Sequence, residues 1–152
     1  MDAMRFDLDA VSLEYLAEVP ALVRRAVASQ DAQEIDAAWV RVMQVSEAFY
    51  SVEPTPSLCQ QLWNPYMDGF VMLGPLAGAL RFVAGKRAAG EDEVADRLGA
   101  VITGLSNRVL GWVAALEAVA RAGRWDDTVV WGDVEAHDPT FSENRRPRFT
   151  AT

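Results

Sequence analysis

The longest helical pattern in the chain is EDEVADRLGAVITGLSNRVLGWVAALEAVARA, residues 91–122. Its large apolar side chains recur at steps of three and four residues, which places them along one face of a helix. These residues are Val94, Leu98, Val101, Leu105, Val109, Trp112, Leu116 and Val119. Acidic residues open the stretch and Arg121 lies in its last turn, so the charges match the helix dipole at both ends. The pattern predicts one long core helix that ends before Gly123.

Glycine is frequent inside this pattern and inside an apolar segment that precedes it. Each glycine costs a helix about 1 kcal/mol relative to alanine. The glycines within these predicted helices are Gly74, Gly78, Gly99, Gly104 and Gly111. Residues so unfavourable in a helix indicate close packing against a neighbouring helix, or a helix break near residues 104–107.

Three other stretches carry helical periodicity and predict further helices. The first covers residues 12–29, and we expect a kink or a split at Pro20 because proline lacks the backbone donor. The second begins after Asp31, a predicted N-cap with Glu34 as its capping-box partner. The third covers residues 57–87 and is interrupted by an Asn-Pro turn signal, since the residue before a proline is pushed out of the helical region.

The sequence changes character after Gly123. Residues 125–137 combine acidic side chains, two tryptophans and the strand-like run Thr128-Val129-Val130-Trp131. No apolar period continues beyond this segment, and we expect a mobile tail over residues 138–152. The predicted fold is therefore all-α. It is a single-domain bundle of four to five helices over residues 1–137 that ends in a C-terminal arm, for which the sequence leaves an extended arm, a lone strand and a turn of helix as alternatives.

The composition excludes several classes of site. The chain has 152 residues with one cysteine, Cys59, and one histidine, His137. A single cysteine forms no internal disulfide and no multi-cysteine zinc site, and a single histidine supports no two-imidazole metal site. We therefore expect no metal ion, no cofactor and no catalytic residue set.

The net charge of −8, from 22 acidic and 14 basic residues, is unevenly distributed. Residues 1–53 hold ten acidic and four basic side chains, net −6, and residues 125–152 hold six and three, net −3. Residues 54–90 hold one acidic and three basic side chains, net +2. A negative field accelerates encounter with basic partners and repels nucleic acid, so we expect no nucleic-acid ligand.

These patterns favour a non-enzymatic acidic domain that binds a protein partner with a basic surface. Tryptophans beside acidic residues suit a binding hot spot, because tryptophan buries a large area at low entropic cost. The predicted contact residues are Trp125, Asp126, Asp127, Trp131, Asp133 and Glu135. Inhibitors, immunity proteins and antitoxins are of this kind. The same tryptophans could instead clamp the arm onto the bundle.

Two alternative functions use other parts of the sequence. One is a small-molecule-binding or enzymatic bundle with a pocket at a turn between helices, although the same turn could be a packed corner. The residues of that predicted pocket are Trp63, Tyr66, Asp68 and Trp112. The other is a homo-oligomeric structural protein, such as a homodimer, joined through the glycine faces at Gly74 and Gly78 or at Gly104 and Gly111.

The N-terminal residues lack the basic and apolar regions of a secretory signal, which predicts a cytoplasmic location. Two apolar stretches, residues 69–85 and 98–120, have nearly the length of a membrane span. The first contains Arg81 and the second contains Arg108 near its centre. Such a charge costs a membrane helix about 2.5–3.5 kcal/mol, so we expect the core helices of a soluble bundle and no membrane contact.

Overall fold

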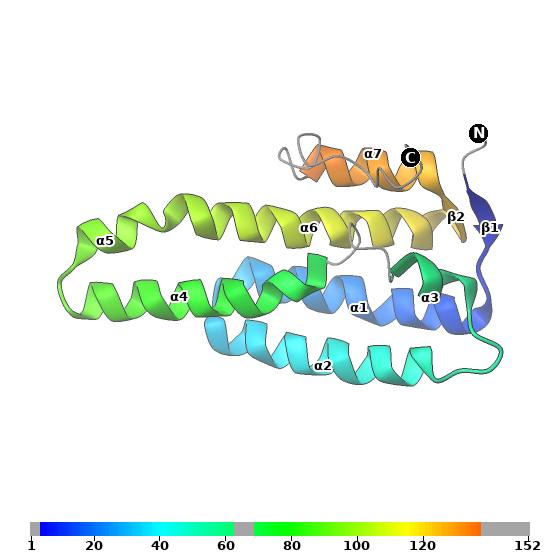
Figure 1. Cartoon of the computed structure of the whole chain (residues 1–152), viewed down its shortest axis with the longest axis horizontal. Helices are drawn as coiled ribbons and strands as arrows, with labels where there is room; N and C mark the ends of the chain where they lie inside the picture. The colour runs from blue at the N-terminus through cyan, green and yellow to red at the C-terminus, as the bar shows by residue number, and fades with distance from the viewer. Residues whose placement is uncertain (1–3, 63–68, 138–152) are drawn as a thin grey trace, which may run out of the picture.

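The computed structural model describes residues 4–62 and 69–137, which form a bundle of antiparallel helices (Figure 1). The long helices are α1 (Ala10–Ser29), α2 (Ala32–Tyr50), α4 (Leu73–Ala88) and α6 (Gly99–Ala122). Both α1 and α4 pack against α2 and α6, so the helices enclose one core. The predicted all-α bundle is confirmed.

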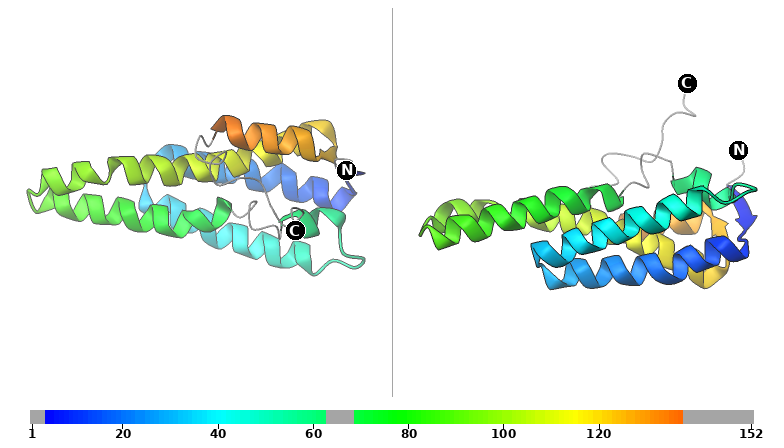
Figure 2. Two further views of the ribbon diagram at one scale, coloured as in Figure 1. Left: turned by 45° about the horizontal axis from the view of Figure 1, so that its top comes forward. Right: turned by 90° about the horizontal axis from the view of Figure 1, so that it is seen from below.

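Shorter elements join the long helices. They are β1 (Arg5–Asp7), α3 (Ser57–Leu62), the 3-10 turn η2 (Gly69–Met72), α5 (Asp92–Arg97), β2 (Arg124–Asp126) and α7 (Asp127–His137). The two strands pair antiparallel, and α7 packs on α6. Figures 1 and 2 show α7 and α2 on opposite sides of the bundle.

The core is built from the apolar faces of the long helices. Val19 and Val23 of α1, Ile35 and Val42 of α2 and Leu116 of α6 are all 0% exposed. Burial of an aliphatic side chain of this size contributes about 1.5–3 kcal/mol relative to its exposed state. These residues lie at helical spacing in the sequence, so the hydrophobic periodicity itself determines which face of each helix turns inward.

The connection between α1 and α2 is a tight turn. Gln30 adopts a left-handed conformation at the end of α1, and its amide side chain donates to the Val27 carbonyl at 2.8 Å. Asp31 then accepts hydrogen bonds from the backbone N–H groups of Gln33 and Glu34, as expected of an N-cap. This short connection places the two helices antiparallel and in contact.

The expected split at Pro20 does not occur, because α1 continues through this residue. Pro20 is buried, and the neighbouring Val19 and Val23 are fully enclosed by the core. Tertiary packing of the flanking turns therefore offsets the hydrogen bond that proline cannot donate.

The helix predicted over residues 91–122 is divided into α5 and α6, which meet at Leu98. The predicted break near residues 104–107 is wrong, since α6 is continuous there. The apolar face is buried from Val109 onward, whereas Val101 is 48% exposed. This difference arises because α5 and the start of α6 extend with the end of α4 beyond the ends of α1 and α2 (Figures 1 and 2).

The stretch Asp92–Ala122 is long and apolar enough to cross a membrane by length and composition alone. Core helices of soluble proteins meet the same criteria. Here the second half of the stretch contributes Trp112, Val113, Leu116 and Val119 to the core of the bundle.

The C-terminal arm is extended only over its first residues. Trp125 pairs with Phe6 across the two-stranded sheet, and residues 127–137 then form α7. The strand-like run from Thr128 to Trp131 is therefore helical, so of the alternatives for the arm the extended one applies to its first residues and the helical one to residues 127–137. Asp126 accepts a hydrogen bond from the Thr128 backbone N–H at 3.1 Å, and Val130 is buried. Local capping and burial thus override the β-propensity of these residues. The tail predicted over residues 138–152 lies outside the described residues.

Candidate protein-binding site

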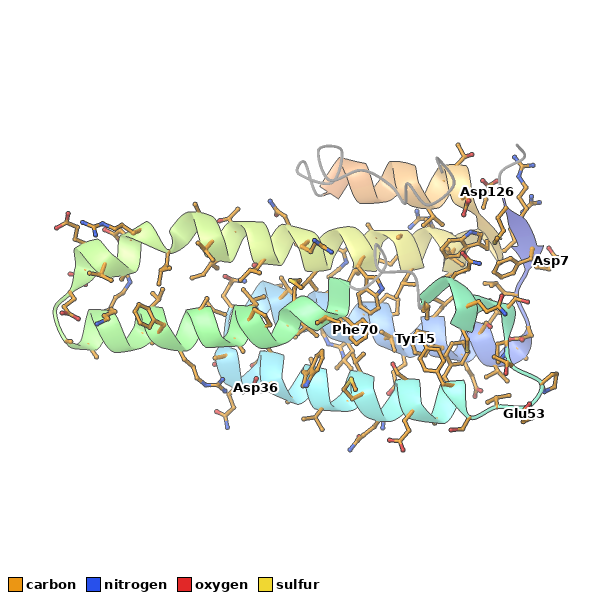
Figure 3. The ribbon with its side chains drawn as sticks, in the orientation of Figure 1. Asp7, Tyr15, Asp36, Glu53, Phe70 and Asp126 are labelled. Atoms are coloured by element: carbon orange, nitrogen blue, oxygen red, sulfur yellow. The ribbon has the colours of Figure 1, made fainter. Side chains whose placement is uncertain are left out.

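The first residues of the predicted contact arm have structural roles. Trp125 is 0% exposed, its ring is stacked with Phe6 at 6.1 Å between centroids, and its Nε1 donates to Asp127 at 2.6 Å. Asp126 forms an ion pair with Arg5 at 3.2 Å. Figure 3 shows Asp126 at the same end of the molecule as Asp7 of β1. Trp125, Asp126 and Asp127 therefore attach the arm to the N-terminal strand.

The other predicted contact residues, Trp131, Asp133 and Glu135, belong to α7. Their side chains are outside what the structure describes. A partner contact through these residues stays a prediction. It would be made on the side of the bundle that carries α7, away from α2 (Figure 1).

Of the alternative pocket residues, Trp63, Tyr66 and Asp68 lie outside the described residues. Trp112 is 3% exposed and packs against Phe70, with ring centroids 5.5 Å apart. Within the described residues, the Trp112 indole Nε1 has no hydrogen-bond partner.

The surroundings of Trp112 are tightly packed. Phe70 also stacks on Trp39 at 5.8 Å, so three aromatic rings connect α2, η2 and α6. Gly69 lies so close to Trp112 that a methyl group there would collide with the Trp112 side chain. The part of this region that the structure describes is a packed corner between helices.

The buried titratable groups are poorly suited to nucleophilic chemistry. Cys59 is 1% exposed, and burial raises the pKa of its thiol to about 11. Burial also raises the pKa of the Tyr15 hydroxyl to about 12. Both groups are therefore protonated at neutral pH, and a thiol that is not ionised is a weak nucleophile. Among the side chains that the structure describes, which do not include those of Asp133, Glu135 and His137, no three His, Cys, Asp or Glu groups converge as metal ligands.

A groove of about 490 Å³ runs between α1 and α2. Its apolar lining is formed by Val11, Tyr15, Val45, Ala48, Phe49 and Val52. Its polar lining is formed by Glu14, Glu18, Arg41 and Gln44. We call this feature the acidic groove.

Two stacked aromatic rings form the floor of the acidic groove. The rings of Tyr15 and Phe49 are 4.5 Å apart between centroids with an interplanar angle of 22°, and both residues are buried. The Tyr15 and Ser46 hydroxyl groups share a hydrogen bond of 3.3 Å. Figure 3 shows Tyr15 where α1 faces α2. The floor is therefore fixed by aromatic packing and by one buried polar contact between the two helices.

The rim of the acidic groove carries unbalanced negative charge. Arg41 is paired with Glu18 at 2.7 Å, which neutralises one carboxylate. Glu14 is exposed and has no ion-pair partner among the described residues. Carboxylates around an apolar floor suit a ligand with both apolar and cationic groups, because each part of the surface then meets its complement.

Exposed apolar side chains also lie on other sides of α1 and α2, outside the lining of the acidic groove. Leu13 is 42% exposed, Val40 is 53% exposed and Met43 is 45% exposed. Methionine and aliphatic groups at a surface adapt well to a bound protein segment.

The sequence gives only an indirect signal of this site. The excess of acidic residues before position 54 is visible without a structure. The stacking of Tyr15 on Phe49 is not visible, because it depends on the register in which α1 packs against α2. No known protein-family model matches the sequence, and no curated protein or solved structure matches it.

Proposed function

We propose that this protein is a non-catalytic binding domain whose acidic groove takes an apolar and basic segment of a partner protein. The observation that carries the proposal is the stacked Tyr15–Phe49 floor beneath a rim on which the Glu14 carboxylate is unpaired. A helical segment of the partner, laid along α1 and α2, would bury its apolar side chains on that floor. A lysine or arginine side chain of the segment would meet Glu14 at the rim.

The charge balance of the first two helices supports a basic partner. Residues 1–53 carry net −6. Of the four basic residues there, Arg5 is paired with Asp126, Arg24 with Glu117 and Arg41 with Glu18, and the fourth, Arg25, does not line the groove. The field at the groove is therefore dominated by carboxylates, and such a field raises the association rate with cationic partners.

Inhibitors, immunity proteins and antitoxins are a narrower form of the same function. A protein of this type covers a basic active site or a basic nucleic-acid-binding surface on its target. The acidic groove has the sign of charge that this role requires. The test of the narrower form is whether the partner, once identified, loses its own activity when the complex forms.

The experiment is affinity capture from the native cell with two matched variants. Ala48 is an exposed groove residue on α2, and Ala48→Arg would place a long cation over the floor without loss of helix propensity. Ala37 is an exposed residue outside the groove on the same helix, so Ala37→Arg makes the same change in charge. Mass spectrometry would identify the proteins that each bait retains.

We expect one partner with a basic segment to be retained by the wild type and by Ala37→Arg. Its recovery with Ala48→Arg is expected to fall by about tenfold or more, equivalent to about 1.4 kcal/mol. Retention of the same partner by all three baits would refute binding in the acidic groove. The variant Glu135→Lys provides a separate test of the C-terminal arm, because α7 lies on the other side of the bundle (Figure 1).

A further inference from the structure

The chain itself contains a segment with the chemistry that the acidic groove is proposed to bind. Residues 145–149 read Arg145-Arg146-Pro147-Arg148-Phe149, so three cationic side chains directly precede an aromatic one. No other four consecutive residues of the sequence hold three cations. We call residues 145–149 the basic segment. It follows α7 in the sequence and lies outside the described residues.

The cations of the described residues are largely committed to other carboxylates. Of the eleven lysine and arginine side chains in residues 4–62 and 69–137, at least seven form ion pairs. At the rim of the acidic groove, Arg41 pairs with Glu18 at 2.7 Å. Glu14, one helical turn earlier on α1, has no ion-pair partner among the described residues. The groove thus retains a carboxylate to which the basic segment offers a cation.

The basic segment matches the acidic groove in charge and in apolar character. Residues 1–53, which include α1 and α2, carry net −6, whereas the basic segment carries +3. Opposite charges of this size favour contact between the two regions. The Phe149 side chain suits the stacked rings of Tyr15 and Phe49, because aromatic rings pack favourably against one another in offset and tilted arrangements.

The number of residues after α7 is sufficient for the basic segment to reach the acidic groove. α7 packs on α6, α6 on α1 and α1 on α2, so the groove is about 25 Å from α7 at 8–10 Å between neighbouring helix axes. Along the bundle the two lie close, because α1 follows β1, α7 follows β2, and the two strands pair. Residues 138–149 can span at most about 40 Å. This length allows a path over the surfaces of α6 and α1.

We propose that the basic segment occupies the acidic groove of its own chain. The inference rests on the function proposed above for the groove, and it adds a means of regulation. Phe149 packs over the floor formed by Tyr15 and Phe49, and an arginine of the segment pairs with Glu14. Residues 138–144 hold the segment at a millimolar effective concentration, so a weak contact is enough to fill the groove. A partner must displace it, which lowers the apparent affinity by the fraction of chains whose groove is open.

The experiment is disulfide cross-linking of the full chain. One variant combines Ala48→Cys, in the groove, with Thr150→Cys, directly after the basic segment. The matched control combines Thr150→Cys with Ala37→Cys, because Ala37 is exposed on the same helix outside the groove. The natural Cys59 is 1% exposed and stays in both proteins. We expect the Ala48 pair to form an intramolecular disulfide about tenfold faster than the Ala37 pair, measured by gel mobility without reductant.

A charge variant tests whether the arginines are responsible for the contact. Arg145→Glu, Arg146→Glu and Arg148→Glu together are expected to remove the preference for the Ala48 pair. Salt at 1 M is expected to reduce it, because the Debye length falls to about 3 Å. Equal rates for the two cysteine pairs would overturn the proposal. Disulfide-linked dimers in place of the intramolecular product would also overturn it, since the segment would then reach the groove of a second copy.

Capture of the partner separates this inference from the function proposed for the groove. With the three-glutamate variant as bait, recovery of the partner is expected to rise by about threefold or more over the wild type. Unchanged recovery would overturn the competition. Equal cross-linking rates, together with loss of the partner in Ala48→Arg, would refute the intramolecular contact and leave the proposed function standing. Fast cross-linking at Ala48 without any captured protein would support the contact and refute the proposed partner.

Discussion

The indole Nε1 of Trp125 donates a hydrogen bond of 2.6 Å to the Asp127 carboxylate, across the junction between β2 and α7. The bond satisfies the one polar atom of a fully buried tryptophan. It also holds the first residue of α7 against the strand that precedes it. The two residues thus determine where the chain turns from strand to helix, and their first role is structural.

Substitutions at Trp125 are expected to separate the contribution of the hydrogen bond from that of burial. Trp125→Phe keeps most of the apolar area and loses the donor, so we expect a loss of about 1–3 kcal/mol from the free energy of unfolding. Trp125→Ala also leaves a cavity and is expected to cost about 3–5 kcal/mol. Urea denaturation followed by circular dichroism measures both values. Equal losses for the two variants would contradict this assignment.

The fold is expected to lose stability at alkaline pH. Burial raises the pKa of Cys59 from 9.0 to about 11 and that of Tyr15 from 10.0 to about 12. The unfolded chain therefore releases these protons at a lower pH than the native protein does. The stabilisation is complete below pH 9 and is lost as the pH rises toward 12, by up to about 1.4 kcal/mol per pH unit for each group.

Urea denaturation at a series of pH values from 8 to about 11 measures this loss. The variant Tyr15→Phe provides the control, because it removes one titrating group and keeps the ring that stacks on Phe49. The free energy of unfolding of this variant is expected to be lower than that of the wild type at pH 8, because the variant lacks the hydrogen bond to Ser46. Above pH 10 it is expected to fall less steeply with pH than that of the wild type. Identical slopes for both proteins would rule out Tyr15 as a source of the pH dependence.

The Cys59 thiol is expected to react slowly with thiol reagents in the native protein. It is 1% exposed, and its raised pKa keeps it protonated at neutral pH. Labelling with a disulfide reagent at pH 7.5 is therefore expected to require opening of the structure around α3. Labelling in denaturant would provide the control, because it measures the rate at which the fully exposed Cys59 thiol reacts. Rapid labelling without denaturant would show that the burial of this thiol is incomplete.

Two glycines of the bundle are expected to respond to alanine in opposite directions. Gly69 lies against Trp112, so Gly69→Ala forces the aromatic corner to move and is expected to cost about 1–3 kcal/mol. Gly104 faces open space on α6, so Gly104→Ala is expected to stabilise the monomer by up to about 1 kcal/mol. Thermal unfolding of the two variants beside the wild type measures both changes. A gain in stability for Gly69→Ala would contradict the packing described for Trp112.

Features set by local interactions could be predicted from the sequence. Asp31 caps α2 because its carboxylate reaches the N–H groups two and three residues later, and that spacing is visible in the chain. Val23, Ile35 and Leu116 are buried because helical periodicity turns them inward. The all-α fold follows from such patterns, and the structure confirms it.

Features that depend on tertiary contacts could not be predicted. Pro20 remains within α1, and residues 127–137 form a helix, because packing against neighbouring helices overrides the local preferences of both segments. The acidic groove requires Tyr15 and Phe49 to meet across two helices, and no local pattern places them together. The sequence marks Trp125 as a partner contact or as a clamp of the arm, and its burial against Phe6 depends on a strand more than a hundred residues away in sequence.

The pairing of β1 with β2 has a consequence for how the chain folds. Residues 5–7 acquire their partner only after residues 124–126 are available, so this contact spans nearly the whole described chain. Contacts between residues so distant in sequence form late, because a long loop must close before they yield any stabilisation. The contacts of α1 with α2, of α4 with α5 and of α6 with α7 join segments much closer in sequence, whereas α1 with α6 is the other contact that spans most of the chain. The helices are therefore expected to assemble early, and the strand pair to close the two ends together in a final, slower step.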